Sequence, residues 1–261
     1  MINLDVVDQV AWVTLQRPEK QNALSFEMFK SLDKIAKQLK KDKQLRAVVI
    51  QGSGEHFSSG LDVKSVVKSP SKILQLLWKW LPGNANLVQR VVLRWQALPV
   101  PVFALIRGNC LGGGLQIALG CDFRIASSDA RFAILESRWG LCPDMGATIH
   151  LPAQLNYDDA LWLSMSAETI SAKNAKEIGL ITHLCDDPKA RCIELIAQLS
   201  ERSPDALAKI KALCQHAYHS HERTLLSKET LSQIQLLGTK NTRIVMKNNQ
   251  TTEHMPFAPR K

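Results

Sequence analysis

The feature that most constrains this chain is a glycine-rich turn between two apolar segments, in residues 101–120 (PVFALIRGNCLGGGLQIALG). The run PVFALI predicts a buried strand, and the apolar pattern that begins at Leu115 predicts a helix. Four glycines fall within residues 108–114, so main-chain N–H groups can approach a ligand without obstruction by side chains. The first N–H groups of a helix have no intrahelical partner and favour negative charge. The segment therefore predicts a strand-to-helix turn that holds a phosphate or a developing oxyanion, although close packing of strand and helix would also explain the glycines.

Strand and helix patterns alternate along the rest of the chain. Predicted strands lie at 2–7, 9–15, 46–52, 101–106, 121–128, 130–135 and 179–184, and predicted helices at 25–41, in two pieces within 63–98, and at 115–120, 187–201, 204–219 and 223–247. Ser25 is expected to cap the first of these helices. This order predicts an α/β sheet core followed by a helical region.

The composition fits a large globular protein with an anionic partner. The 261 residues are 45% hydrophobic and 22% charged, and a chain of this length buries roughly three quarters of its unfolded surface. The formal net charge of +9 attracts anions. Lys and Arg are spread along the sequence and no nucleic-acid-binding motif is present, so nucleic acid is not the expected partner. An anionic small molecule suits the charge equally well.

The six cysteines form no CxxC pair, so a metal site is not expected and most of them are predicted to be buried. Asp5 and Asp8 occupy the stretch where a signal peptide needs a basic start and an apolar run. No run of 18 apolar residues is present, so no membrane span is expected. A cytoplasmic location is the simplest expectation.

Several blocks together resemble the enoyl-CoA hydratase/isomerase family, also called the crotonases. In family order they are LQRPEKQNAL, AVVIQGSGEHFSSGLD, GNCLGGG, GCDFRIASSDARFAILE and WGLCPDMGAT. The resemblance implies an α/β fold, a crotonase-like spiral of ββα units with a helical C-terminal region. It divides the chain into a core with an acyl-CoA site (1–195) and an oligomerisation region (196–261). It also implies a homotrimer or a dimer of trimers, and a lyase or isomerase of fatty-acid breakdown that needs no cofactor, because coenzyme A enters as part of the substrate.

The resemblance also assigns binding residues. The two oxyanion-hole amides fall on the backbone of Leu61 and Gly113. Substrate-binding positions fall on Ser59, Gly60, Asp62 and Gly112. The stretch from Arg17 to Asn22 resembles a CoA-binding loop, and Lys20 and Lys64 are the basic side chains expected near the phosphates.

The carboxylates decide which reaction is expected. A typical hydratase of this family has two glutamates, and this chain has Gln116 at the first position and Glu136 at the second. Glutamine can hold a water molecule but cannot exchange a proton at neutral pH, so Glu136 alone is expected to act as the acid/base, which suffices for a proton shift. Asp144 resembles an aspartate that dienoyl-CoA isomerases pair with a glutamate at the position of Glu136. The alternatives are therefore a dienoyl-CoA isomerase, or a non-catalytic homologue that binds acyl-CoA or RNA.

Simpler roles compete for some of these residues. Glu136 also suits the start of a helix, and Asp144 also suits a helix cap. Trp78, Trp80 and Trp139 are expected in the core, and His56 at the surface.

Overall fold

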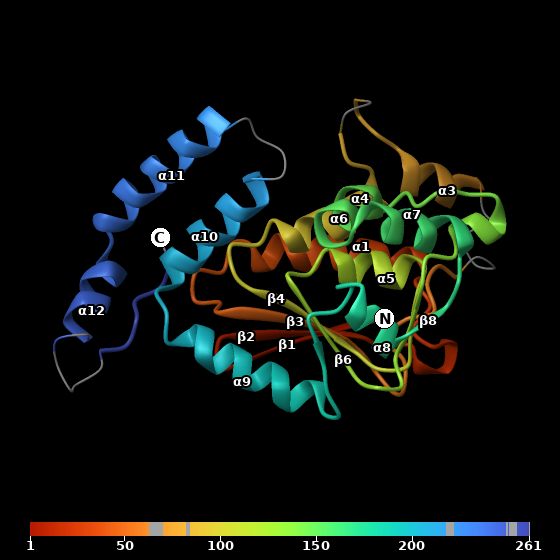
Figure 1. Cartoon of the computed structure of the whole chain (residues 1–261), viewed down its shortest axis with the longest axis horizontal. Coiled ribbons are helices and arrows are strands. Elements are labelled where there is room, and N and C mark those ends of the chain that lie inside the picture. Colours follow the sequence, from red (N-terminus) through yellow and green to blue (C-terminus); the bar gives the residue numbers. More distant parts are fainter. Residues whose placement is uncertain (63–69, 82–83, 218–221, 249, 251–254, 261) are drawn as a thin grey trace.

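A six-stranded sheet forms the centre of the computed structural model, which describes residues 1–62, 70–81, 84–217, 222–248, 250 and 255–260 (Figure 1). The strands lie in the order β1-β2-β3-β4-β6-β9. Their bounds are β1 Ile2–Val7, β2 Val10–Leu15, β3 Ala47–Gly52, β4 Val102–Ile106, β6 Phe123–Ala126 and β9 His183–Leu184. The β1–β2 pair is antiparallel and the other neighbouring pairs are parallel.

The β1–β2 pair is the hairpin that the N-terminal sequence predicts. Val7 pairs with Val10, and the two residues between them, Asp8 and Gln9, have φ values of 49° and 65°. Two consecutive left-handed residues make the tight turn whose twist matches that of the strands.

Helices cover both faces of the sheet (Figure 1). The helices are η1 Pro18–Lys20, α1 Phe26–Leu39, α3 Pro70–Leu77, α4 Leu87–Gln96, α5 Gly113–Leu119, η2 Glu136–Trp139, α6 Ala147–Gln154, α7 Tyr157–Ser166, α8 Ala172–Glu177, α9 Pro188–Ser200, α10 Pro204–Ala217, α11 Glu222–Leu237 and α12 Lys240–Asn248. Ser25 caps α1 as predicted, because its side chain accepts a hydrogen bond from the backbone N–H of Met28 at 3.4 Å. On the other face, α9 buries Cys192 and Ile196 against the sheet. Two-sided cover explains why β3 and β4 are nearly all apolar.

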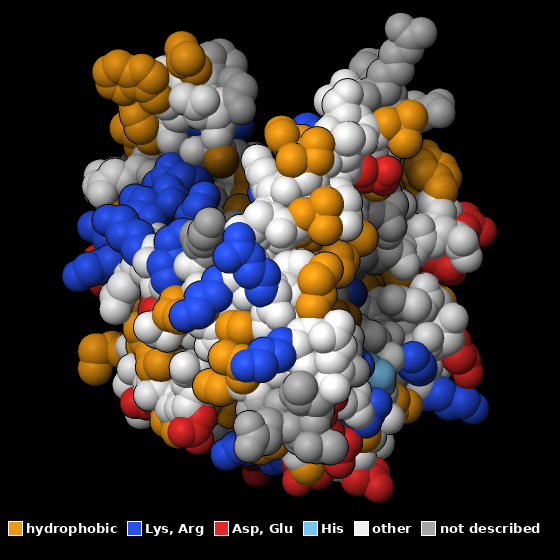
Figure 2. All heavy atoms as spheres, turned by 90° about the vertical axis from the view of Figure 1, so that its left-hand side faces the viewer, with side chains coloured by type: hydrophobic (Ala, Val, Ile, Leu, Met, Phe, Trp, Pro, Cys, Tyr) orange, Lys and Arg blue, Asp and Glu red, His pale blue; other side chains and the backbone are white. Residues whose placement is uncertain are grey.

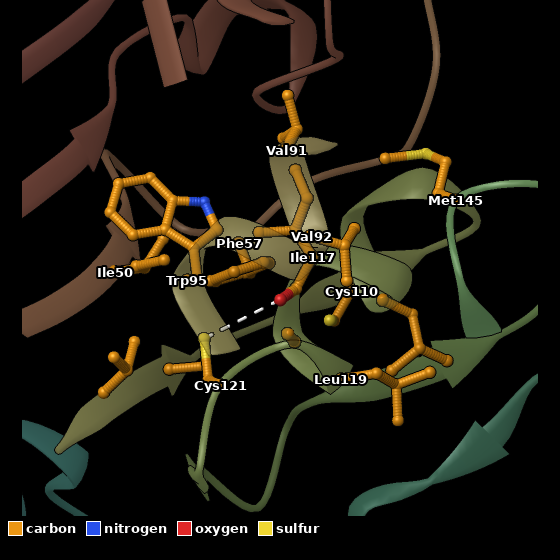
Figure 3. Close-up of a cluster of buried hydrophobic side chains, with 14 of the residues drawn as sticks. Ile50, Phe57, Val91, Val92, Trp95, Cys110, Ile117, Leu119, Cys121 and Met145 are labelled. Atoms are coloured by element: carbon orange, nitrogen blue, oxygen red, sulfur yellow. Dashed lines mark hydrogen bonds between the residues drawn. The ribbon is translucent and has the colours of Figure 1, made fainter. Parts of the chain in front are cut away.

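A cluster of buried side chains fixes the position of α5 (Figure 3). Val92 and Trp95 of α4 lie against Ile117 and its neighbours, and both are fully buried. A Cβ atom at Gly120 would come within 2.7 Å of Val92 Cγ1, so glycine is required for this close approach. The Cys121 thiol donates to the carbonyl of Ile117 at 3.7 Å. The packing of α5 on α4 holds the start of α5, where Gly113 lies, in one place.

A second, three-stranded sheet in the order β5-β7-β8 carries the glycine-rich turn. Its strands are β5 Asn109–Leu111, β7 Arg131–Ala133 and β8 Ile170–Ser171. Strands β5 and β8 are too short, at three and two residues, to show a strand pattern in the sequence and were not among the predicted strands. The helix α5 begins at Gly113, two residues before the predicted start at Leu115, because a helix that starts on glycines shows no apolar pattern there.

The C-terminal helices form an arm beside the core (Figure 1). The sequence predicted one helix at 223–247, and this is wrong: α11 ends at Leu237 and α12 begins at Lys240. The Thr239 hydroxyl accepts from the backbone N–H of Thr242 at 3.1 Å and so caps α12. Near the end of the chain, the buried Arg260 side chain donates to the carbonyls of Asp42 and Leu45 at 2.7 and 3.0 Å, which ties the tail to the core.

Three tryptophans contradict the predicted core. Trp78, Trp80 and Trp139 are 61%, 83% and 66% exposed, because no element in the described parts of this single chain covers them. The predicted division at residues 195 and 196 falls within α9, and it stays a prediction. Lys64 and the start of the predicted helical stretch at 63 lie outside the described residues.

Lys and Arg residues that are spread along the sequence gather in space. Figure 2 shows a broad group of them on the face of the molecule where the C-terminal helices lie. No helix in the described parts of the chain has the length and apolar character that crossing a membrane requires.

Candidate active site

Three segments that are distant in sequence meet beside β5. Ser58 forms a parallel bridge with Cys110, and Leu24 forms one with Leu61. The Ser58 N–H donates to the backbone carbonyl of Asn109 at 2.8 Å, and the Leu111 N–H donates to that of Ser58 at 2.9 Å. These bridges bring the loop after β2, the FSSGLD segment and the glycine-rich turn together.

The backbone N–H groups of Leu61 and Gly113 lie at this junction. The Leu24–Leu61 bridge uses the N–H groups of Leu24 and Asp62, which donate at 2.7 and 3.0 Å, and it leaves out that of Leu61. Gly113 is the first residue of α5, so its N–H precedes the hydrogen bonds made within the helix. Among the described residues, neither N–H group has a backbone acceptor, so both are candidate donors to a ligand.

Gly60 allows the two loops to come this close. Its φ of +92° is a conformation that side chains disfavour, and a Cβ atom there would lie 2.9 Å from the carbonyl oxygen of Leu111. The same Cβ would lie 3.4 Å from the amide nitrogen of Gly113. A side chain at position 60 would push the two predicted oxyanion donors apart.

Gly112 stands between these amides and the carboxylate of Glu136. Its φ is +49°, and a Cβ atom at this position would lie 3.8 Å from Glu136 Oε1 and 3.9 Å from Gly60 Cα. The glycine thus leaves open the short path between the predicted oxyanion donors and the predicted acid/base.

Gln116 binds Glu136 directly. Gln116 is completely buried, and its Nε2 donates to Glu136 Oε1 at 2.6 Å. Its Oε1 accepts from the backbone N–H groups of Met145 and Ala147 at 3.0 and 3.4 Å. Glu136 is the first residue of η2, and its Oε2 is buried with no hydrogen-bond partner among the described residues. Gln116 therefore holds one of the two carboxylate oxygens.

The surroundings of Glu136 favour its protonated form. Burial raises the pKa of Glu136, and the nearby negative charge of Asp144 raises this pKa further, whereas hydrogen bonds from Gln116 and the backbone oppose the change. Burial also raises the pKa of Asp144, although part of this side chain faces solvent. Asp144 lies in the loop before α6 and does not cap it, because the N-cap position is Gly146.

An ion pair ties the FSSGLD segment to the loop after β2. Arg17 Nη1 lies 2.8 Å from Asp62 Oδ2 and donates to the carbonyl of Ala23 at 3.2 Å. The Ser59 N–H donates to the backbone carbonyl of Gln21 at 2.9 Å, and the Ser59 hydroxyl donates to the backbone carbonyl of Lys20 at 3.3 Å. The side chain of Lys20 is exposed. The predicted substrate-binding positions Ser59, Gly60 and Asp62 thus lie on one cross-linked pair of loops.

Asn22 organises these loops, a role that the sequence analysis missed. It is fully buried, its Nδ2 donates to the carbonyls of Ser53 and His56 at 2.9 and 2.7 Å, and its Oδ1 accepts from the Arg17 N–H at 2.8 Å. The Asn22 carbonyl also accepts from the Ser58 hydroxyl at 2.9 Å. A local signal exists, because Asn tolerates the left-handed φ of 54° found here, but its partners Ser53, His56 and Ser58 are more than 30 residues away.

His56 and Met145 complete the surroundings of the turn. His56 is half-buried and accepts at Nδ1 from the Asn109 N–H at 3.1 Å, so it is part of the loop structure and not a surface residue as predicted. Met145 is buried, and its sulfur lies 3.0 Å from where a Cβ atom at Gly113 would be. In the described parts of the chain, no three His, Cys, Asp or Glu side chains gather as a metal site.

Comparison with known proteins agrees with this geometry. The family model for enoyl-CoA hydratase/isomerase matches residues 6–250. YngF of Bacillus subtilis, a candidate enoyl-CoA hydratase/isomerase, is 34% identical over 242 residues, which cover 90% of this chain and 89% of YngF. The mitochondrial Δ(3,5)-Δ(2,4)-dienoyl-CoA isomerase of Mus musculus is 31% identical over 76% of this chain and 63% of its own. This chain belongs to the enoyl-CoA hydratase/isomerase family.

Solved structures support the same family. The enoyl-CoA hydratase of Bacillus anthracis superposes with a TM-score of 0.89 at 25% identity, covering 98% of each chain. A candidate enoyl-CoA hydratase of Streptomyces coelicolor gives 0.90 at 28% identity, covering 99% of this chain and 94% of its own. The predicted crotonase-like α/β fold is thereby confirmed. The roles of individual residues stay predictions.

Proposed function

We propose that this protein shifts the double bond of an enoyl-CoA thioester, with Glu136 as its one acid/base. The observation that carries the proposal is the 2.6 Å hydrogen bond from Gln116 to Glu136 Oε1, combined with the unpartnered Oε2 of the same carboxylate. A carboxylate held by one oxygen has a fixed direction for proton transfer. Its raised pKa brings it closer to neutral pH, which suits a group that both takes and returns a proton.

The proposed reaction needs one proton and no water. Glu136 Oε2 takes a proton from C2 of a 3-enoyl-CoA, and the electron pair of the broken C–H bond passes into the thioester carbonyl. The backbone N–H groups of Leu61 and Gly113 stabilise the resulting negative oxygen, and the loss of one such donor typically costs about 3–4 kcal/mol in the transition state. The carboxylic acid of Glu136 then protonates C4, and the double bond lies between C2 and C3.

Hydration is not favoured, because Gln116 supplies no second base. Its Nε2 donates to Glu136 and its Oε1 accepts from the N–H groups of Met145 and Ala147. An amide in this arrangement does not take a proton from water at neutral pH.

A dienoyl-CoA isomerase is the second candidate, favoured by one observation. Asp144 lies near enough to Glu136 for its charge to raise the pKa of that residue. Two carboxylates at one site would let one remove a proton from a conjugated substrate and the other supply one at the far end. The mouse relative named above carries a dienoyl-CoA isomerase name.

Turnover of three thioesters separates these functions. 3-Hexenoyl-CoA, 3,5-octadienoyl-CoA and crotonyl-CoA report on isomerase, dienoyl isomerase and hydratase activity, and thioester absorbance follows each. We expect turnover of 3-hexenoyl-CoA that falls about 10²- to 10⁴-fold in Glu136→Gln and is unchanged in the control Glu201→Gln, an exposed glutamate. Absence of turnover on all three substrates would overturn the proposal and favour a homologue that only binds acyl-CoA or RNA.

The variant Gln116→Glu tests the reason for the missing hydratase activity. A glutamate in the same side-chain position would face Glu136 at about the 2.6 Å of the present hydrogen bond, so the two carboxylates would share one proton. We expect hydration of crotonyl-CoA to rise above that of the natural protein once this pair has ionised. If hydration does not rise at any pH, the missing second carboxylate is not the reason for its absence.

We also propose that the C-terminal helices assemble the protein as a trimer. This proposal is supported by the exposed apolar side chains of α11, namely Leu226, Leu231, Ile234 and Leu237. Light scattering of the whole chain is expected to give three or six times the mass of 29.1 kDa, and a monomer at micromolar concentration would contradict it.

A further inference from the structure

A second hollow lies away from Glu136, between α10 and the core. The cavity has a volume of about 420 Å³, within the range of pockets that hold small ligands. Its walls are mostly apolar and include Leu119, Phe123, Ile149, Leu207 and Ile210. None of the residues of the candidate active site lines it.

Polar contacts hold α10 over this cavity. Lys211 Nζ lies 2.6 Å from Asp122 Oδ2 and donates to the carbonyl of Val100 at 2.9 Å. One helical turn later, Gln215 Nε2 donates to the carbonyl of Gln96 at 2.7 Å. The helix is therefore fixed at two points, and the space between helix and core is built into the fold.

The charged groups in the cavity wall do not cancel. Lys211 and Arg124 carry one positive charge each and Asp122 carries one negative charge, which leaves one positive charge. Arg124 is 5% exposed, and its hydrogen bonds in the described parts of the chain go to backbone carbonyls: its Nε donates to that of Leu180 and its Nη1 to that of Cys121, each at 2.7 Å. His150 also lines the wall.

A cavity with an apolar wall and a net positive charge favours a ligand that is apolar and carries one negative charge. Burying a charge without an opposite charge is costly, and an anionic group that enters the cavity would reduce that cost. The apolar side chains would bury a hydrocarbon body at about 25 cal/mol per Å². The Lys and Arg side chains on the same side of the molecule also attract anions to it (Figure 2).

We propose that this cavity binds a small amphipathic carboxylate, an apolar molecule with a single negative charge, whose carboxyl end lies beside Lys211 and Arg124, the two cations that share the carboxylate of Asp122. The proposal is independent of the proposed reaction, because it involves neither Glu136 nor the two predicted oxyanion donors.

Two cysteines allow occupancy to be measured at the site itself. Cys142 and Cys214 are the exposed members of the six cysteines, and Cys214 lines the cavity whereas Cys142 lies in the loop before α6. Alkylation by iodoacetamide, followed by peptide mass spectrometry, gives the rate at each cysteine separately. Octanoate is the probe, and octanol is the neutral control with the same apolar body. We expect octanoate to slow alkylation of Cys214 at least fivefold, while octanol has less effect and Cys142 reacts as before.

Two variants test the cause of binding. Asp122→Asn frees Lys211 from its ion pair, and the octanoate concentration for half protection should fall about tenfold, since a hydrogen bond to a charged group is worth about 1.5–3 kcal/mol. Ala153→Trp, in the cavity wall, fills the space and should abolish protection while turnover of 3-hexenoyl-CoA continues.

Three results would overturn the proposal. Equal protection by octanol would mean that charge plays no part. Absence of protection by octanoate up to its solubility limit would mean that the cavity does not bind it. Protection of Cys214 that depends on protein concentration and not on octanoate would mean that a second copy of the chain covers the cavity.

Discussion

Replacing Gln116 with leucine is expected to move the acidic limb of the pH–rate profile to higher pH. Gln116 donates to Glu136 Oε1 at 2.6 Å, and this hydrogen bond is one of the contacts that lower the pKa of Glu136 against the raising effect of burial. Leucine removes the donor but keeps the site filled. The ionised carboxylate, which is the form that accepts the substrate proton, then becomes harder to populate.

The size of the effect follows from the hydrogen bond. A hydrogen bond to an ionised group contributes about 1.5–3 kcal/mol, and a change of one pH unit corresponds to about 1.4 kcal/mol, so the limb should move up by about one to two pH units. The same substitution leaves the N–H groups of Met145 and Ala147 without their acceptor, at a cost of about 1–3 kcal/mol each in the free energy of unfolding. Activity is therefore measured well below the lowered melting temperature.

The assay is kcat/KM for 3-hexenoyl-CoA as a function of pH. The matched control is Gln154→Leu on α6, which removes a glutamine that donates to the carbonyl of Leu119 at 3.2 Å and has no contact with Glu136. The acidic limb of the pH–rate profile of this control should lie at the same pH as in the natural protein. A limb that stays fixed or moves to lower pH in Gln116→Leu would refute the view that Gln116 sets the protonation of Glu136.

Three further predictions concern the same site. Glu136→Gln should have a higher melting temperature than the natural protein at pH 7 in differential scanning calorimetry, because burial penalises the ionised carboxylate. This increase in melting temperature should vanish below the ordinary pKa of 4.5, where the carboxyl is protonated in both the folded and the unfolded protein. An increase that persists at such a low pH would contradict the prediction. Gly60→Ala should lower kcat about 10²- to 10³-fold, because a side chain there disturbs a predicted donor amide. The control Gly140→Ala, at a φ of +68° with no atom within 4 Å of the new Cβ, should lose only about 1–2 kcal/mol of stability. Equal kcat values for the two variants would contradict the prediction. Arg17→Leu should raise KM for the thioester several-fold with a smaller effect on kcat, and the exposed control Lys41→Leu should change neither.

Local sequence patterns were sufficient to predict most of the strands and helices of the core. Strands β3 and β4 are covered on both faces, so their residues are nearly all apolar and easily recognised. The helix α1 shows its buried side at Met28, Phe29, Leu32 and Ala36, with Ser25 before it as the cap. Such signals depend only on neighbours in the chain.

Other features depend on distant partners, which the sequence does not reveal. The contacts of Gln116 illustrate this, because its partners Glu136, Met145 and Ala147 lie 20 to 31 residues away. A large apolar side chain such as that of Trp139 is usually buried, and only the position of η2 in the fold leaves it exposed. The break between α11 and α12 follows Gly238, a residue that commonly ends helices, and the prediction of a single helix at 223–247 ignored this local signal.

In the proposed reaction one carboxylate, Glu136, carries a proton from C2 to C4 of the substrate. This transfer can be followed with deuterium during a single turnover of 3-hexenoyl-CoA labelled at C2, with mass spectrometry of the product. We expect a 2-enoyl-CoA with measurable deuterium at C4, no 3-hydroxyacyl-CoA, and loss of the transfer in Glu136→Gln. A product without label at C4, or a 3-hydroxyacyl-CoA as the main product from the natural protein, would contradict it.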